Sequence, residues 1–240
     1  MEKADVARMK EAAGRAAVDA LVESGMKLGL GTGSTAIHAV RRVGELLSAG
    51  RLAGVTAFAT SLQTEIECER LGIPFFPLNS RELSGALDLT IDGADEVDPR
   101  GCLVKGGGGA MLVEKIAAYA SRAFAVAVDE SKLVAAIGAG FPIPVEVVPA
   151  ARVTAARAIE ALGARAVLRE AVRKAGPVVT EHGNLILDIL FAAAIDPTAM
   201  ETELNRIPGV VENGIFSRAL PAVFAGRADG TVTCGNVSSP

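Results

Sequence analysis

Short apolar segments alternate with helical segments through the first half of this 240-residue chain, and this alternation constrains the fold more than any other feature. A continuous apolar segment at residues 123–128 is typical of a strand buried on both faces of a parallel sheet. Further strands are predicted at residues 26–30, 55–59, 73–76 and 87–91. Helices are predicted at residues 5–24, 36–49, 62–71 and 110–121. Strands that alternate with helices in this way predict an α/β fold with a doubly wound, mostly parallel sheet.

The pattern changes from about residue 137, where prolines follow at positions 142, 144 and 149. A helix at 150–162, strands near 178–179 and 185–190 and a helix at 198–206 predict a small mixed unit. Short apolar segments return at 209–216, 222–224 and 232–233 and could complete the main sheet. We therefore expect a main domain of residues 1–136 plus 210–240, with residues 137–209 inserted in it.

Composition narrows the classes of function. The net charge is −4, with no basic run and few aromatic residues, which argues against nucleic acid as a partner. No segment reaches the ~18 uninterrupted apolar residues of a membrane span, and the N-terminus lacks the apolar core of a signal peptide. The three cysteines form no CxxC pair and are typical of free thiols in a reducing cytoplasm. With two histidines far apart in sequence, we expect no metal site, and acid–base chemistry would rest on carboxylates and lysines.

A glycine- and hydroxyl-rich loop follows the first predicted strand. Residues 31–36 read GTGSTA, which fits the dinucleotide fingerprint G-x-G-x-x-[G/A]. That fingerprint also needs an acid at the end of the second strand, where this chain has Thr60 and Ser61. Three hydroxyls at a predicted helix N-terminus favour a phosphate monoester or another small anion, and they belong to Thr32, Ser34 and Thr35. A dinucleotide site and a structural turn remain the alternatives.

An acidic loop follows the predicted strand at 87–91, where residues 92–98 read DGADEVD. Four carboxylates in this stretch repel one another, so stability does not require them. They could form a solvated loop or a divalent cation site, although the spacing excludes an EF-hand. The functional interpretation is that Asp92 and Asp95 face a pocket and bind sugar hydroxyls or transfer protons. Glu96 and Asp98 would then be outward or structural.

Residues 105–115, KGGGGAMLVEK, contain four consecutive glycines between a cation and a helical segment. Such a run costs backbone entropy and makes sense where the backbone must approach a ligand. A shielded carboxylate, Glu114, could act as a base near neutral pH. Lys105 and the glycine amides could stabilise the oxyanion formed when a proton leaves a carbon next to a carbonyl. Lys132, after the strand at 123–128, could add a second cation. The alternatives are a flexible turn, an exposed helical glutamate and a surface lysine.

These motifs occur together and in order with VDESK at 128–132 and FPIPVEVVP at 141–149, and the chain thereby resembles type A ribose-5-phosphate isomerase over nearly its whole length. The resemblance implies a Rossmann-like domain with a small ferredoxin-like lid and a homodimer or homotetramer. It implies interconversion of D-ribose 5-phosphate and D-ribulose 5-phosphate without metal or organic cofactor. The substrate would be a small sugar phosphate, in the cytoplasm.

The resemblance also implies roles for individual residues. Glu114 matches the general base that moves a proton between C1 and C2 through an enediolate, and Asp92, Asp95 and Lys105 match the other catalytic residues. Candidate substrate-binding positions are Lys10, Thr32, Gly33, Ser34, Thr35, Gly93, Ala94, Gly106, Gly107, Gly108 and Lys132.

Other functions compatible with such a fold are a phosphosugar deaminase, another phosphosugar isomerase, a coenzyme A transferase or a non-catalytic sugar-phosphate sensor. A deaminase would release ammonia, and a transferase would use its glutamate as an acyl acceptor. A sensor would have no need of Lys105 and Glu114 beside the glycines.

Overall fold

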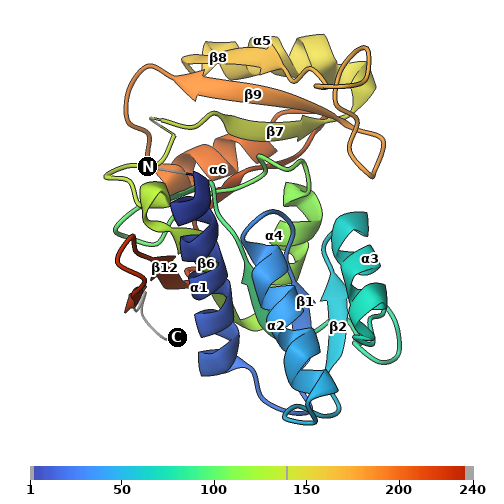
Figure 1. Cartoon of the computed structure of the whole chain (residues 1–240). Helices are drawn as coiled ribbons and strands as arrows, with labels where there is room; N and C mark the ends of the chain where they lie inside the picture. Colours follow the sequence, from blue (N-terminus) through green and yellow to red (C-terminus); the bar gives the residue numbers. More distant parts are fainter. Residues whose placement is uncertain (1–2, 139, 236–240) are drawn as a thin grey trace. The chain divides into compact units, whose positions relative to one another are not determined.

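The computed structural model describes residues 3–138 and 140–235 and divides into two compact units (Figure 1). The first unit comprises the described residues among 1–94, 113–132 and 219–240. The second comprises those among 95–112 and 133–218. The chain therefore leaves the first unit and returns to it twice.

A six-stranded sheet in the order β13-β12-β6-β3-β1-β2 forms the centre of the first unit. Adjacent strands pair in parallel from β2 to β12, and the edge strand β13 pairs antiparallel with β12. This result confirms the predicted α/β class with a mostly parallel sheet. The strands are β1 (Lys27–Leu30), β2 (Thr56–Ala59), β3 (Leu87–Asp92), β6 (Ser121–Asp129), β12 (Ala222–Gly226) and β13 (Val232–Gly235).

Four helices belong largely to this unit: α1 (Lys3–Leu21), α2 (Ala36–Ser48), α3 (Leu62–Leu71) and α4 (Met111–Tyr119), the last beginning in the second unit. Helix α1 packs on α2, β6 and β12. Alternation along β3 separates two faces of the sheet, because successive side chains point to opposite sides. Leu89 and Ile91 join the core that includes α1 and α2. Thr90 points the other way and donates to the Ala117 carbonyl of α4, so α4 covers the opposite face.

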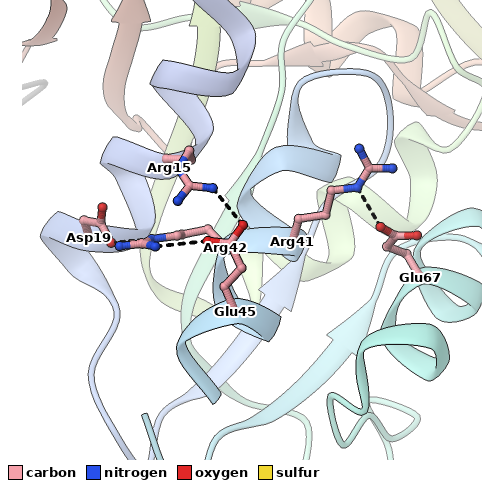
Figure 2. Close-up of polar contacts among 6 residues, drawn as sticks. All are labelled: Arg15, Asp19, Arg41, Arg42, Glu45 and Glu67. Carbon is pink, nitrogen blue, oxygen red and sulfur yellow. Dashed lines mark hydrogen bonds and ion pairs between the residues drawn. The ribbon is translucent and has the colours of Figure 1, made fainter. Parts of the chain in front are cut away.

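Ion pairs link α1, α2 and α3 on the outside of the core (Figure 2). Glu45 accepts from Arg15 of α1 at 2.8 Å and from Arg42 at 3.0 Å. On the other side of α2, Arg41 donates to Glu67 of α3 at 2.7 Å. Exposed pairs of this kind are individually worth roughly 0–1 kcal/mol. The packing of α1, which carries Lys10, on α2 rests mainly on the apolar core that the two helices share.

The second unit contains a four-stranded antiparallel sheet in the order β10-β7-β9-β8. Its elements follow one another as β-α-β-β-α-β, the ferredoxin-like succession: β7 (Ile143–Val147), α5 (Arg152–Ala161), β8 (Ala164–Leu168), β9 (Leu185–Phe191), α6 (Pro197–Asn205) and β10 (Val210–Asn213). Residues such as Val145, Ile159 and Leu204 form a separate apolar core. The ferredoxin-like expectation is confirmed, whereas a movement of this unit as a lid stays a prediction.

A small three-stranded antiparallel sheet, β11-β5-β4, also lies in the second unit. It is formed by β4 (Glu96–Val97), β5 (Leu103–Val104) and β11 (Ile215–Phe216). Two short 3-10 helices complete the described elements, η1 (Glu130–Lys132) and η2 (Pro149–Ala151).

The structure differs from the sequence-based expectations in several places. Residues 178–179 form no strand beyond an isolated bridge between Val179 and Leu185, and β8 was not expected. Residues 209–216, which could have completed the main sheet, instead supply β10 and β11 of the second unit.

Residues 73–76 do not form a strand, because only an isolated bridge joins Phe75 to Ala57. Residues 143–147 form a strand despite Pro144, whose carbonyl accepts from Gly214 N at 2.7 Å. The second unit is also larger than the predicted insertion at 137–209, because the β4, β5 and β11 segments pair with one another there.

Candidate functional site

Gly29 of β1 and Gly31 directly after this strand allow β3 to pass very close to β1. A Cβ on Gly29 would lie 1.9 Å from Thr90 Oγ1, and a Cβ on Gly31 would lie 2.1 Å from Asp92 Oδ1. Neither distance is compatible with a side chain. Gly29 and Gly31 therefore answer a packing requirement at the ends of β1 and β3, whereas an added Cβ on Gly33 would meet no described atom within 4 Å.

Asp92 is fully buried at the carboxyl end of β3. Its Oδ1 accepts hydrogen bonds from Thr32 N at 3.1 Å and Gly93 N at 2.7 Å. The structure thus brings together three of the predicted site residues, Asp92, Thr32 and Gly93. Backbone amides that point at one carboxylate oxygen fix its orientation.

Thr32 uses its hydroxyl inside the protein. The Oγ1 atom lies 2.6 Å from Ser61 Oγ and 2.8 Å from Thr60 Oγ1. Thr60, Ser61 and the nearby Thr64 were not among the predicted site residues. The sequence could have indicated Thr60 and Ser61, because they directly follow β2. The end of β2 lies beside the end of β1 in a parallel sheet.

The start of α2 carries the remaining predicted anion-binding groups of this loop. Gly33 has φ +102°, a left-handed conformation that favours glycine. Ser34 is exposed and accepts from Lys10 Nζ at 2.9 Å. Thr35 occupies the N-cap position, and a Cβ on Gly93 would lie 3.8 Å from the Thr35 Cβ. A cation, a hydroxyl and the amides of a helix N-terminus here form an arrangement suited to a phosphate.

Glu114 lies in the first turn of α4 and is 4% exposed. The position of Glu114 along the sheet follows from two contacts between α4 and β3. Ala120 O accepts from Leu87 N, and Ala117 O accepts from Thr90 Oγ1, so α4 runs antiparallel to β3. Three residues before Ala117, about 4.5 Å along the axis, Glu114 is at the level where β3 ends. Its backbone position is therefore near the edge of the sheet at which Asp92 lies.

Lys132 belongs to the same edge, because it follows β6 in η1 and is half-buried. Asp129 ends β6 and accepts from Ser131 N at 3.1 Å, which turns the chain into η1. Ala94 is the last residue of the first unit before the chain enters the second.

The second unit holds Asp95, Lys105 and the glycine run. Gly107 N donates to Asp95 Oδ2 at 2.8 Å, and a Cβ on Gly107 would lie 2.8 Å from Asp95 Oδ1. Gly106 has φ +103° and Gly109 has φ +80°, and Gly109 N donates to Gly106 O at 3.0 Å. The run therefore forms a hydrogen-bonded turn that also binds Asp95. An added Cβ on Gly108 would meet no described atom within 4 Å.

Lys105 is 3% exposed, with its Nζ 5.6 Å from the centre of the Phe216 ring. Its backbone amide donates to Gly214 O at 2.9 Å. An ammonium group near an aromatic face is stabilised by the ring quadrupole. The aromatic contact and the backbone bond hold a buried cation directly before the glycine run.

Glu96 and Asp98 have structural roles, as one of the two sequence alternatives predicted. Glu96 is 3% exposed and accepts from the amides of Gly138 and Phe141 at 2.6 and 2.8 Å. Asp98 accepts from Arg100 N and Cys102 N at 2.9 and 2.8 Å. The acidic stretch is thus largely buried and is not a solvated loop.

Arg169 is a contact of the glycine run that the sequence did not indicate. Its Nη1 donates to the carbonyls of Gly106 at 2.9 Å and Gly107 at 3.2 Å. Its Nε donates to Asp188 of β9 at 2.8 Å. Arginine presents several donors in a rigid plane, which suits such a multiple contact.

Two features are absent from residues 3–138 and 140–235. No group of three or more His, Cys, Asp or Glu side chains is placed to hold a metal ion. No helix within these ranges has the length and apolar character needed to cross a bilayer.

Comparisons with known proteins agree on one family. The sequence model for ribose 5-phosphate isomerase A (phosphoriboisomerase A) matches residues 56–230. The chain is 50% identical over 235 residues to ribose-5-phosphate isomerase A of Treponema denticola, covering 95% of this chain and 98% of the relative. It is 45% identical over 226 residues to ribose-5-phosphate isomerase A of Thermococcus kodakarensis, with 94% and 97% covered.

Solved structures give the same result. A D-ribose-5-phosphate isomerase in complex with phospho-erythronic acid superposes with a TM-score of 0.90 at 40% identity, covering 95% of this chain and 98% of that one. Ribose 5-phosphate isomerase A of Methanocaldococcus jannaschii superposes with a TM-score of 0.87 at 41% identity, with 94% and 96% covered.

Proposed function

The chain belongs to the ribose-5-phosphate isomerase A family and acts on ribose 5-phosphate, and we propose that it moves a proton between C1 and C2 with Glu114 as the base. The proton leaves C2 of the open-chain aldose, an enediolate forms, and a proton is delivered to C1 to give D-ribulose 5-phosphate. The observation that carries this proposal is the burial of Glu114 at the sheet edge where β3 ends. A carboxylate with little access to water is a stronger base than one in solution.

The other catalytic groups divide the remaining work. Asp92, held by two amides, would contact the sugar hydroxyls and assist ring opening together with Asp95. Lys105 would neutralise the negative charge of the enediolate, with the amides of the glycine run as further donors. The phospho-erythronic acid bound in one related structure supports this assignment. It combines a phosphate with a carboxylate, and the carboxylate carries negative charge where an enediolate would.

The phosphate would bind where α2 begins. Lys10 supplies a cation, Ser34 and Thr35 supply hydroxyls, and Gly33 exposes its backbone. Gly93 and Ala94 would lie along the sugar, Gly106, Gly107 and Gly108 would contact its reacting end, and Lys132 would add a second cation. In this scheme, remote binding of the phosphate holds the reacting carbons in place.

We also propose a homodimer or homotetramer that works in the cytoplasm without metal or organic cofactor. Unpaired thiols agree with a reducing compartment, because Cys68 and Cys102 are buried and free. Burial raises the pKa of the Cys68 thiol to about 12, which keeps it unreactive at neutral pH.

Isomerisation in D₂O tests the mechanism. Chelator-treated protein is incubated with ribose 5-phosphate and the product is followed by NMR. We expect ribulose 5-phosphate with deuterium at C1, because the enediolate takes a proton from a group that exchanges with solvent. Product without deuterium, together with an undiminished rate in Glu114→Gln, would contradict the proposed route. Loss of activity on chelation that added metal restores would contradict the absence of a metal.

A further inference from the structure

Four hydroxyl groups meet where β1 and β2 end: those of Thr32, Thr60, Ser61 and Thr64. Thr60 and Thr64 are each 1% exposed and Ser61 is 6% exposed. We call these four residues the hydroxyl cluster. All of its members lie in the first unit.

Each hydroxyl has one proton to donate. The distances indicate the acceptor of most of these protons. Thr64 donates to Gly31 O at 2.8 Å, and Thr60, whose hydroxyl is also 3.1 Å from Leu30 O, is left as the donor to Thr32 Oγ1 at 2.8 Å. Thr32 donates to Ser61 Oγ at 2.6 Å. The proton of Thr32 is therefore directed into the protein, so this hydroxyl does not donate to an anion bound at the start of α2.

The cluster instead holds the carbonyl end of a peptide group whose amide end binds Asp92. The carbonyl of Gly31 and the amide of Thr32 belong to the same planar unit. Thr64 binds the carbonyl oxygen at 2.8 Å, and the amide of this unit donates to Asp92 Oδ1 at 3.1 Å. A rotation of the unit that weakens the first bond also moves the second.

We infer that Thr64 is a positioning residue of the isomerase reaction, acting on Asp92 through the peptide between Gly31 and Thr32. The inference rests on the catalytic role proposed for Asp92. Thr64 comes from α3, which carries none of the residues assigned above to the substrate. Its hydroxyl fixes the direction of an amide, and the amide fixes the carboxylate.

The test compares Thr64→Val, which keeps the shape but removes the hydroxyl, with Thr64→Ser, which keeps the hydroxyl. We expect kcat to fall about tenfold in Thr64→Val, the usual worth of one buried hydrogen bond, and to return close to the wild-type value in Thr64→Ser. The inhibition constant of inorganic phosphate should change less than about twofold, because the anion-binding groups are untouched. Thr154→Val is the matched control, since Thr154 makes a comparable backbone bond at an exposed position of α5.

Each other outcome overturns the inference. An unchanged kcat in Thr64→Val, or a Thr64→Ser variant as slow as Thr64→Val, removes the hydroxyl from the role. A raised inhibition constant of phosphate with unchanged kcat would mean that the cluster positions only the anion-binding loop and not Asp92. Asp92→Asn is measured alongside, because full activity there contradicts the proposed function itself, whereas normal Thr64→Val beside slow Asp92→Asn contradicts only this inference.

Thr64→Ala provides a second variant if Thr64→Val does not fold. It removes the same hydroxyl and its bond to Gly31 O, but keeps the amide of Thr32 that binds Asp92. We expect the same fall in kcat with little change in the inhibition constant of phosphate. A wild-type kcat in Thr64→Ala, or an inhibition constant raised tenfold with unchanged kcat, would overturn the inference.

Discussion

Arg169 and Asp188 form a two-point ion pair, and the same guanidinium binds the backbone of the glycine run. Arg169 follows β8 and Asp188 lies on β9, so the sheet of the second unit anchors this turn directly. The amide of Gly107 in turn binds Asp95. An uninterrupted series of bonds therefore joins Asp188 to a proposed catalytic carboxylate within one unit.

Arg169→Lys should lower kcat/KM for ribose 5-phosphate about tenfold or more. A lysine keeps the charge but cannot bind a carboxylate at two points and two carbonyls at once, and charge-assisted bonds are worth about 1.5–3 kcal/mol each. Steady-state kinetics measure the effect. Arg157→Lys, at an exposed position of α5, is the control and should leave kcat/KM unchanged. Equal activity of the two variants would mean that Arg169 does not position the turn.

Glu114→Gln should reduce kcat by about 10²–10⁴, the contribution expected of a positioned general base. The amide has nearly the same shape, so we expect the melting temperature and phosphate inhibition to be retained. Glu69→Gln, an exposed change on α3, serves as the control. Substantial turnover by Glu114→Gln would remove Glu114 from the role of base.

Alanine at two adjacent glycines should have different effects. In Gly107→Ala the new Cβ would displace the Asp95 carboxylate, 2.8 Å away, so kcat/KM should fall. In Gly108→Ala the Cβ meets no described protein atom within 4 Å, and the free energy of unfolding should change by less than about 0.5 kcal/mol. If Gly108 faces the substrate as proposed, KM should nevertheless rise. Chemical denaturation combined with kinetics distinguishes the two results, and an unaltered KM would place Gly108 outside the site.

Lys10→Ala should mainly raise KM for ribose 5-phosphate. Lys10 Nζ lies 2.9 Å from Ser34 Oγ at the proposed phosphate position, away from the reacting carbons. Loss of a contact made equally in the ground and transition states raises KM without lowering kcat. The comparison is with Lys174→Ala, because Lys174 is exposed and its Nζ donates to the nearby backbone carbonyl of Pro177 at 3.3 Å. A fall in kcat at constant KM would contradict a phosphate-binding role.

Glu67 should make stability depend on pH in the acidic range. Hydrogen bonds from Arg70 and, secondarily, Arg41 lower the pKa of the Glu67 carboxyl below its ordinary value of 4.5. Because the folded-state pKa is lowered, this stabilisation is present above the unfolded-state pKa and is lost as the pH falls through the folded-state value. Urea unfolding at pH 7 and pH 3 should show that Glu67→Gln loses less stability than the wild type, by about 1 kcal/mol or less. An identical loss in both proteins would contradict this contribution.

Much of the fold could be predicted from the sequence because it depends on local patterns. The apolar segments at 26–30, 87–91 and 123–128 correspond to β1, β3 and β6, and the loops after them are at the carboxyl edge of a parallel sheet. The strand expected at 73–76 failed because an apolar segment alone does not ensure pairing. The strand at 143–147 was not predicted because Pro144 argues against a central strand.

The sequence by itself determined which chemical groups stand at which strand ends: buried-type carboxylates, a lysine before glycines, and hydroxyls before a helix. The tertiary structure decided what those groups contact. Thr32 and Thr64 meet although 32 residues separate them, and Arg169 reaches the glycine run across 63 residues. Such contacts depend on the order and register of strands and on the direction of each side chain. Local sequence fixes neither, because hydrogen-bond partners are selected only when distant segments pack together.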